Sequence, residues 1–472
     1  MTTGTLTDTP RTHGIFRPFR SEARSLVSLA VPLIAGSASF TLFGLINSIF
    51  LGPLGEVPLA AVSLTMSVSI ILYGALFGLI GPVGYLVGTA FGAGDDKKIS
   101  EVVRHGAVLG FGAGVVGLAL MALALPALPH LGQPAAVLEV ITPYWLLSGL
   151  SMVPFFTGMV FKSFYDAVNR PWTGTALSLV SVLVNVLLTW IFVTGPSGLP
   201  ALGLTGAGVS AVLSGTVGAL VMAAHFYLSP AHAPYRQAVP WRKAAFAEQL
   251  REGLPMGAQY LLEGGAITVA GVLIGLLGAA ALAANQIVFS VLGVLWVVPI
   301  GMSMAVGIRV AQAAGGGERA RARHIGLTGM ALASLWSLVF TVLLLVWGER
   351  VAGLFVADPE VVAVASALFV VWGLSQLFDG VQSVGVGVLR GLFDNRYPTV
   401  VSLIAYWLVS LPLGAAFGFA FGWGAAGVWA GYGVGLGVAS ALLVRRLWRV
   451  TSTAETPVAE LPAEPAAEAR AA

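Results

Sequence analysis

The sequence predicts an all-α polytopic membrane protein with twelve transmembrane helices in two six-helix lobes. Hydrophobic residues make up 57% of the 472-residue chain and charged residues only 10%, against about 25% charged in an ordinary soluble domain. Apolar stretches of about 20 residues or more, the length that crosses a bilayer, recur from Leu26 to Leu447. The two halves of the chain also resemble each other.

Short polar, glycine-rich or proline-containing breaks divide the apolar stretches into spans. In chain order the expected spans are 25–51, 59–88, 102–125, 138–163, 172–194, 205–228, 250–278, 281–312, 324–347, 360–390, 398–421 and 425–448. Helices are favoured because each satisfies its own backbone in lipid, and the stretches are too long for barrel strands. The first span lacks a small-residue cleavage site, so we expect a retained helix instead of a signal peptide.

Basic residues lie in the breaks or at the ends of the spans that border them, almost all on one side of the membrane in this topology. Of the 24 lysine and arginine residues, 23 share that side, and only Arg350 lies on the other. Loops rich in Lys and Arg stay in the cytoplasm, so we expect both termini there, in a plasma (inner) membrane. The pI of about 9.2 thus reflects topology and does not indicate nucleic acid. The chain has no cysteine, which excludes disulfides and thiolate chemistry.

The second half of the chain repeats the first. At an offset of 223 residues, Pro32 aligns with Pro255, Leu54-Gly55 with Leu277-Gly278, Leu59-Ala60-Ala61 with Leu282-Ala283-Ala284, and Gly92 with Gly315. At an offset of 228, Lys162-Ser163-Phe164-Tyr165-Asp166 aligns with Arg390-Gly391-Leu392-Phe393-Asp394. Because six spans is an even number, both halves enter the membrane in the same orientation. The pseudo-two-fold axis therefore runs along the membrane normal, as in many secondary transporters with sites near the midplane.

The repeat divides the chain into five expected parts. A cytoplasmic N-terminal arm, 1–24, precedes the N-lobe, 25–228, and a polar cytoplasmic linker, 229–249, leads to the C-lobe, 250–448. The cytoplasmic tail, 449–472, is rich in Ala, Glu and Pro, a composition typical of disorder.

Glu263 and Asp379 are the only carboxylates placed deep inside long apolar segments. A rise of about 1.5 Å per residue puts Glu263 roughly 18 Å, and Asp379 roughly 16 to 17 Å, from the cytoplasmic edge. A charge at this depth is costly and marks function by default. Two acids at one level in one lobe can hold and release a proton, or a sodium ion with nearby oxygens, so we expect a cation-coupling site. Hydrogen bonding to a neighbouring helix is the structural alternative.

The repeat supports a functional role for the acids, because Phe40 and Ser151 stand at the equivalent N-lobe positions. The N-lobe offers only Asn47, which can bind or hydrogen-bond but cannot titrate. Further candidates to support the acids or line a substrate cavity are Gln259, Tyr260, Asn285, Gln286, Gln382, Ser383 and Tyr406. Simple helix–helix hydrogen bonding remains the alternative for each of them.

Other features of the sequence have local interpretations. Pro255, two turns before Glu263, is a candidate hinge, because a proline frees a backbone carbonyl and permits bending. Asp166 and Asp394 follow basic residues at span ends, so we expect each to cap the next helix. The chain has no G-x-x-x-x-G-K-[ST] phosphate cradle. An ion gradient, sodium or proton, must therefore drive any work, and we expect no cofactor.

Several motifs in the same order resemble the multidrug and toxic compound extrusion (MATE) transporters over about residues 25 to 448. They are Leu54-Gly55 with Leu59-Ala60-Ala61, the run from Pro299 to Val310, the run from Val388 to Asp394, and Tyr406-Trp407 with Leu411-Pro412-Leu413-Gly414. The resemblance implies two lobes, alternating access, and export of amphipathic, often cationic compounds in exchange for sodium ions or protons. It implies a transporter and not an enzyme, and we expect it to be monomeric in the lipid bilayer.

The resemblance also assigns the acids. In the branch with a C-lobe acid pair, one acid in helix 7 and one in helix 10 couple to the cation, and Glu263 and Asp379 occupy those positions. Many bacterial relatives carry an aspartate in helix 1 where this chain has Asn47, which directs attention to the C-lobe.

Three rival functions remain to be weighed. A flippase or exporter of a lipid-linked or metabolite substrate would need basic residues in its cavity, and we expect no Lys or Arg at mid-span. An ion channel would need a symmetric pore, whereas the acids are confined to one half. A scaffold would not need buried acids.

Overall fold

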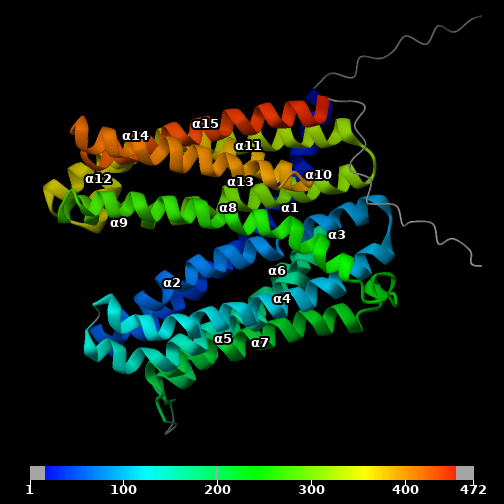
Figure 1. Cartoon of the computed structure of the whole chain (residues 1–472), viewed down its shortest axis with the longest axis horizontal. Helices are drawn as coiled ribbons and strands as arrows, with labels where there is room; N and C mark the ends of the chain where they lie inside the picture. The colour runs from blue at the N-terminus through cyan, green and yellow to red at the C-terminus, as the bar shows by residue number, and fades with distance from the viewer. Residues whose placement is uncertain (1–15, 133, 197–199, 453–472) are drawn as a thin grey trace, which may run out of the picture.

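The computed structural model describes residues 16–132, 134–196 and 200–452, which form helices and short connections without a β-strand. Within the first helix, the side chains at 16–20, 38–43, 45, 47 and 48 also lie outside the described part. Figure 1 shows two bundles of long helices, the lower one coloured mainly blue to green and the upper one green to red, with the deep-blue start of α1 beside the upper one. The predicted tail beyond residue 452 lies outside the described residues.

Each bundle corresponds to one half of the chain. The first half contains α1 (Phe16–Leu51), α2 (Glu56–Ile80), α3 (Pro82–Ala93), α4 (Asp96–Ala124), α5 (Ala135–Ala167), α6 (Pro171–Thr194) and α7 (Gly203–Leu228). The second half contains α8 (Lys243–Gly275), α9 (Ala279–Leu295), α10 (Val297–Gly315), α11 (Arg319–Phe355), α12 (Pro359–Gly391), α13 (Arg396–Ser402), α14 (Leu411–Ala415) and α15 (Gly424–Ser452). Two π-helical segments, Leu403–Ser410 and Ala416–Ala420, flank α14.

In the residues that the structure describes, eleven helical segments are long and apolar enough to cross a membrane. α2 continues into α3, α9 into α10, and α13 through α14 to Ala420, and each of these runs forms one span. α1, with 36 residues, supplies the first span. The chain is therefore an integral membrane protein of the predicted all-α class.

The helices extend beyond the apolar stretches from which the spans were predicted. α1 already begins at Phe16 and α8 at Lys243, where the sequence indicated starts at 25 and 250. The added turns carry charged side chains such as Arg24 and Glu248. Hydropathy marks only the part of a helix that lies in lipid, so it misses turns that continue into water.

The two lobes pack their helices in the same way, as an internal repeat requires. In the N-lobe, α5 is the central helix and packs against α4 and α7. In the C-lobe, the equivalent α12 packs against α11 and α15. The fourth span of each half is therefore the core helix of its lobe.

The lobes meet near the end of the bundle that carries Lys98, Arg104, Arg242 and Arg309, which we name the basic end. There α2 packs against α8, and α3 against α10. From this seam the helices of the two lobes diverge toward the opposite end, at the left of Figure 1. The molecule is therefore closed between the lobes at the basic end.

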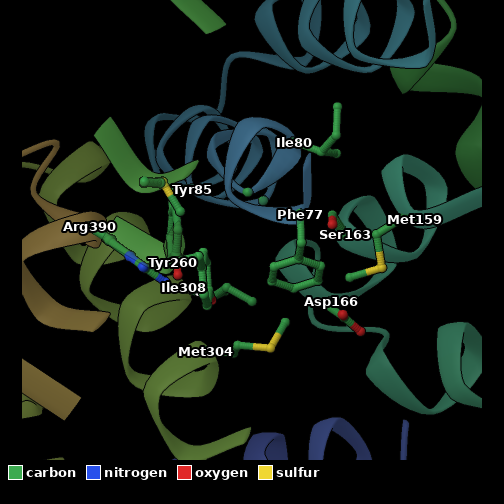
Figure 2. A pocket seen from close by; sticks show the side chains of 13 residues that line it. Phe77, Ile80, Tyr85, Met159, Ser163, Asp166, Tyr260, Met304, Ile308 and Arg390 are labelled. Carbon is green, nitrogen blue, oxygen red and sulfur yellow. Dashed lines mark hydrogen bonds between the residues drawn. The ribbon is translucent and has the colours of Figure 1, made fainter. Parts of the chain in front are cut away.

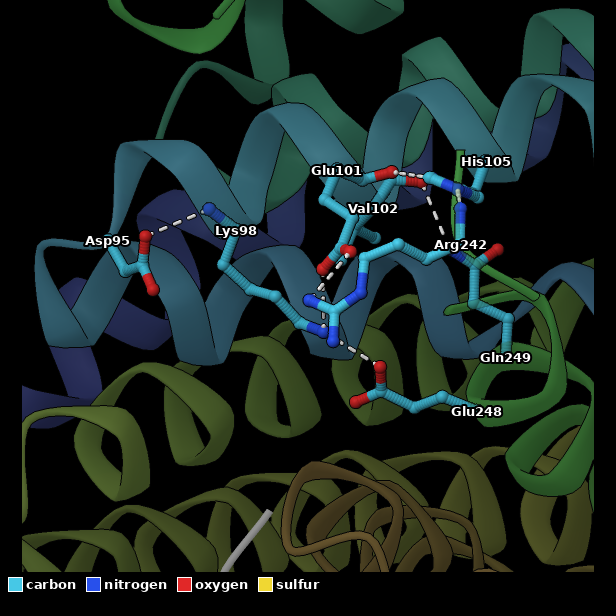
Figure 3. A network of polar contacts seen from close by, with 8 residues as sticks. All are labelled: Asp95, Lys98, Glu101, Val102, His105, Arg242, Glu248 and Gln249. Atoms are coloured by element: carbon cyan, nitrogen blue, oxygen red, sulfur yellow. Dashed lines mark hydrogen bonds and ion pairs between the residues drawn. The ribbon is translucent and has the colours of Figure 1, made fainter. Parts of the chain in front are cut away.

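Polar contacts cross the seam at its outer edge, as Figure 3 shows. Lys98 Nζ of α4 donates hydrogen bonds to Glu248 of α8 at 2.7 Å and to Glu101 at 3.1 Å. Arg242, just before α8, forms an ion pair with Glu101 at 3.6 Å. His105 accepts a hydrogen bond at Nε2 from the backbone N–H of Arg242 at 3.1 Å. These contacts attach the start of α8 to the N-lobe.

Candidate cation site in the C-lobe

Glu263 of α8 lies among polar side chains inside the C-lobe. Its Oε1 accepts hydrogen bonds from Gln259 Nε2 and Ser402 Oγ, both at 2.9 Å, and from Gln382 Nε2 at 3.4 Å. The three donors belong to α8, α13 and α12. An ionised carboxylate only accepts hydrogen bonds, so three donors on one oxygen suit a deprotonated glutamate.

Asp379 of α12 lies within electrostatic reach of Glu263, so the two acids occupy one region of the C-lobe. Its Oδ2 is buried and has no hydrogen-bond partner within the described part of the chain. Tyr406 and Tyr432 also interact electrostatically with both acids, and their rings stack with centroids 5.3 Å apart. A buried carboxylate oxygen without a partner is costly, and a proton or a cation would satisfy it.

Asn285 and Gln286, which the sequence grouped with the acids, are not among the partners of Glu263. Asn285 Oδ1 accepts a hydrogen bond from Trp429 Nε1 at 2.8 Å. Trp429 in turn packs against Trp372 and Tyr432, with ring centroids 4.7 and 5.3 Å away. Gln286 is exposed. Asn285 therefore belongs to a neighbouring aromatic cluster, which covers one side of the acid region.

Arg390 of α12 connects the acid region with the seam between the lobes. Its Nη2 donates a hydrogen bond to Gln259 Oε1 at 3.1 Å, and its Nη1 donates one to Tyr260 Oη at 3.3 Å. A further side-chain hydrogen bond joins it to Tyr85 of α3, in the other lobe. The arginine side chain is only 7% exposed. It is therefore a buried cation that is linked to Glu263 through the side-chain amide of Gln259.

Arg390 is the last residue of the expected span 360–390, and the sequence analysis counted it only among the basic residues that mark the cytoplasmic side. α12 continues to Gly391, and the guanidinium is buried against Gln259. Lys162, which lies at the end of the expected span 138–163, is likewise buried within α5. Hydropathy does not show whether a charged side chain at the end of a span turns inward, because that depends on the partners that the fold supplies.

The prediction that Asp166 and Asp394 cap the following helices is also wrong. Asp166 is fully buried, and its Oδ2 accepts a hydrogen bond from Lys162 Nζ at 2.7 Å. Asp394 Oδ2 pairs with Arg446 Nε of α15 at 2.6 Å. The N-cap residues of α6 and α13 are Arg170 and Asn395, and neither side chain forms a capping hydrogen bond. Both acids neutralise a cation of their own lobe instead.

A small cavity lies between the lobes beside Arg390. The cavity volume is about 40 Å³, enough for a few water molecules at about 10–15 Å³ each. Figure 2 shows Arg390 and Tyr260 on its C-lobe side and Met159 and Asp166 on its N-lobe side. A drug-sized ligand needs about 300 Å³ or more, so this cavity belongs to the seam and is not a substrate chamber.

Three predicted residues remain, and the structure describes the contacts of two of them, Ser383 and Pro255. Ser383 Oγ donates a hydrogen bond to Gln382 Oε1 at 3.4 Å, one step further from Glu263. The carbonyl of Pro255 accepts a hydrogen bond from Thr399 Oγ1 at 2.7 Å, which ties α8 to α13. The side chain of Asn47 lies outside the described residues, although its backbone belongs to α1.

Ser402, Tyr432 and Arg390 are the members of the site that sequence reasoning missed. Ser402 stands four residues before Tyr406, so on a regular helix it shares a face with a residue already singled out. Tyr432 gave no such signal, because its place beside Tyr406 depends on how α15 packs. Arg390 was visible as the repeat partner of Lys162, but only the fold shows that it turns inward.

The chemistry of the donor set suits a proton or a hard cation. The groups around the acids are carboxylate, hydroxyl and amide oxygens, the ligands that alkali and alkaline-earth ions accept. Within the described ranges, no group of three or more His, Cys, Asp or Glu side chains is placed to hold a metal ion.

Two repeated helical lobes in a membrane, with a pair of partly buried acids in one of them, are typical of a transporter with parallel repeats. The profile of the MatE family matches residues 32–191 and 255–416, one segment in each half of the chain. The chain therefore belongs to the MATE family of transporters, as the motifs suggested.

Curated relatives with at least 30% sequence identity align with nearly the whole chain. A probable multidrug resistance protein NorM of Pseudomonas aeruginosa is 33% identical over 431 residues, covering 90% of this chain and 88% of its own length. A protein of the same name from Synechococcus is 30% identical over 443 residues, covering 92% and 96%.

Solved structures share the fold. The eukaryotic MATE transporter AtDTX14 superposes with a TM-score of 0.82 at 23% identity, covering 92% of this chain and 98% of that one. The Vibrio cholerae MATE transporter VcmN in its bent form gives 0.81 at 23% identity, covering 92% and 99%. This likeness confirms the predicted fold of twelve helices in two lobes.

Proposed function

We propose that this chain is a secondary active antiporter that exports amphipathic, often cationic compounds in exchange for sodium ions or protons. The observation that carries the proposal is the pair Glu263 and Asp379, the first held by three donors and the second with an unpartnered buried oxygen. The names of the relatives, probable multidrug resistance proteins, support a small-molecule substrate.

The hydrogen bonds of Glu263 provide a way for cation occupancy to change the packing of helices. When a proton or a sodium ion occupies Oε1, at least one of its three donors must turn away, because the oxygen has a limited number of lone pairs. Where that donor is Ser402 or Gln382, one link between α8 and a neighbouring helix is lost. Occupancy can thus alter the contacts of α8 with α13 or α12, and Pro255 is the proposed hinge at which α8 bends.

The distribution of charge supports an orientation. Because loops rich in Lys and Arg remain in the cytoplasm, the basic end is cytoplasmic, with both termini on that side of a plasma (inner) membrane. The lobes are closed at this end, so the described conformation is outward-facing. The five-part division at 24, 228, 249 and 448 is retained with this proposal, as is a monomer in the bilayer.

A flippase or exporter of a lipid-linked or metabolite substrate is the alternative, since it would use the same architecture. Such a site needs cations free to hold phosphate. Lys162 is already paired with Asp166 at 2.7 Å, and Arg390 donates to Gln259 and Tyr260. The buried cations therefore favour the antiporter.

The test is transport of a fluorescent cationic dye by the purified protein in proteoliposomes, with sodium and proton gradients imposed separately. Glu263→Gln and Asp379→Asn should each abolish gradient-driven export, and the gradient that drives the wild type identifies the ion. Glu360→Gln, an exposed acid on the same helix as Asp379, is the matched control and should transport normally. If both site variants transport like wild type, the acids are structural and the proposal fails.

A further inference from the structure

Lys162 and Arg390 occupy equivalent positions of the internal repeat, each near one end of the central helix of its lobe. In the N-lobe, Lys162 forms an ion pair with Asp166, four residues later. In the C-lobe, the equivalent acid Asp394 pairs with Arg446 instead. Among the described residues, Arg390 has no carboxylate partner within ion-pair distance. Its charge is therefore not neutralised by a direct ion pair, and the hydrogen-bond acceptors described above for it are neutral groups.

The guanidinium fixes the orientation of the amide beside the coupling acid. Arg390 can only donate hydrogen bonds, and its Nη2 lies 3.1 Å from Gln259 Oε1. The amide oxygen of Gln259 must therefore face Arg390, and its Nε2 must face Glu263 Oε1, 2.9 Å away. Without the arginine, the amide could rotate and present an oxygen to Glu263.

The orientation of Gln259 and the positive charge of Arg390 both disfavour cation binding at Glu263. The Nε2 group of Gln259 donates to Glu263 Oε1, and a hydrogen bond to the ionised carboxylate favours the form without a proton or a bound cation. The charge of Arg390, buried at 7% exposure, also repels a cation at Glu263, an effect that low polarity strengthens. Tyr260 and Tyr85 accept hydrogen bonds from the guanidinium and hold it at the seam.

We propose that Arg390 is a positioning residue of the cation site: by orienting Gln259 it lowers the affinity of Glu263 for the coupling cation. The inference rests on the proposed antiport function. An antiporter must release its cation on the far side of the membrane in every cycle, so a built-in limit on affinity speeds turnover. The N-lobe, which has no acid at mid-span, keeps the ordinary Lys162–Asp166 ion pair.

The experiment measures dye export in proteoliposomes as the concentration of the driving cation is varied, using whichever gradient drives the wild type. For Arg390→Gln we expect the half-saturating cation concentration to fall about three- to tenfold, or the pH midpoint to rise by about 0.5 to 1 unit. The maximal rate should fall because release becomes slower. Arg390→Lys keeps the charge but loses the planar fork, and its shift should be in the same direction and smaller.

The matched control is the double variant Lys162→Gln with Asp166→Asn, which removes the repeat-related ion pair without leaving one buried charge alone. Its half-saturation should equal that of the wild type. Unchanged half-saturation in both Arg390 variants, with Glu263→Gln inactive, overturns this inference and leaves the antiport function intact. If Glu263→Gln transports normally, the proposed function fails instead. A loss of maximal rate alone in the Arg390 variants would indicate a merely structural role and would also overturn it.

Discussion

Gly92 of α3 and Gln312 of α10 meet across the seam between the lobes so closely that a Cβ on Gly92 would overlap the carbonyl oxygen of Gln312. Gly315, the repeat partner of Gly92, lies in the same position against the carbonyl oxygen of Thr89. Each lobe therefore places a glycine against the backbone of the other. A side chain at either position is incompatible with the closed seam.

Gly92→Val should hold the seam open. Overpacking costs about 1–3 kcal/mol, enough to shift a two-state equilibrium by about fivefold or more toward the state open at the basic end. The chain has no cysteine, so a single Met159→Cys reporter in the seam cavity can be labelled cleanly. In inverted vesicles an impermeant maleimide should label this reporter faster in the Gly92→Val background, and export should fall at least tenfold.

The matched control for this variant is Gly112→Val on α4. A Cβ on Gly112 meets nothing within 4 Å, so valine there adds the same helix penalty without touching the seam. Its labelling and export should match those of the wild type. Equal labelling in the Gly92 and Gly112 variants would mean that the seam does not open during transport.

Trp429→Phe should destabilise the protein without changing its cation affinity. The substitution removes the donor to Asn285 Oδ1, which lies 2.8 Å from Trp429 Nε1, and a buried acceptor left unpaired costs about 1–3 kcal/mol. Thermal unfolding in detergent should shift down by a few degrees. The double variant with Asn285→Leu should lose less than the sum of the two single variants. A large change in half-saturation of the coupling cation would instead place Asn285 in the cation site.

The sequence predicts the lobes and the acids better than it predicts the polar partners. Glu263 and Asp379 stand out because a carboxylate in an apolar stretch is visible without knowing how helices pack. Ser402 and Arg390 do not stand out, since a serine is unremarkable in a membrane helix and a charge at a span edge looks like loop. Their roles depend on how α13 and α12 are turned, which is set by tertiary packing and by the π-helical segment Leu403–Ser410.

His232 should make the stability of the N-lobe depend on pH. It lies outside the spans in the turn Pro230–Tyr235 and is fully buried. Burial, together with the charges of Arg170 and Arg236, lowers the pKa of His232 below its ordinary value of 6.5. Arg170 Nη1 is 3.2 Å from His232 Nε2, a contact in which a neutral imidazole accepts the hydrogen bond. The folded protein thus favours the neutral ring.

The sign of the effect follows from proton counting. Between the lowered pKa of the folded state and about 6.5, the unfolded chain binds more protons at His232 than the folded one, so stability rises with pH and is lost as pH falls. The melting temperature of the wild type in detergent should decline between pH 7.5 and 5.5. His232→Gln, which can still accept from Arg170, should reduce this decline by roughly 2 °C. His130→Gln, on an exposed histidine, should leave it unchanged. A slope that is identical in wild type and His232→Gln would show that His232 carries none of the pH dependence.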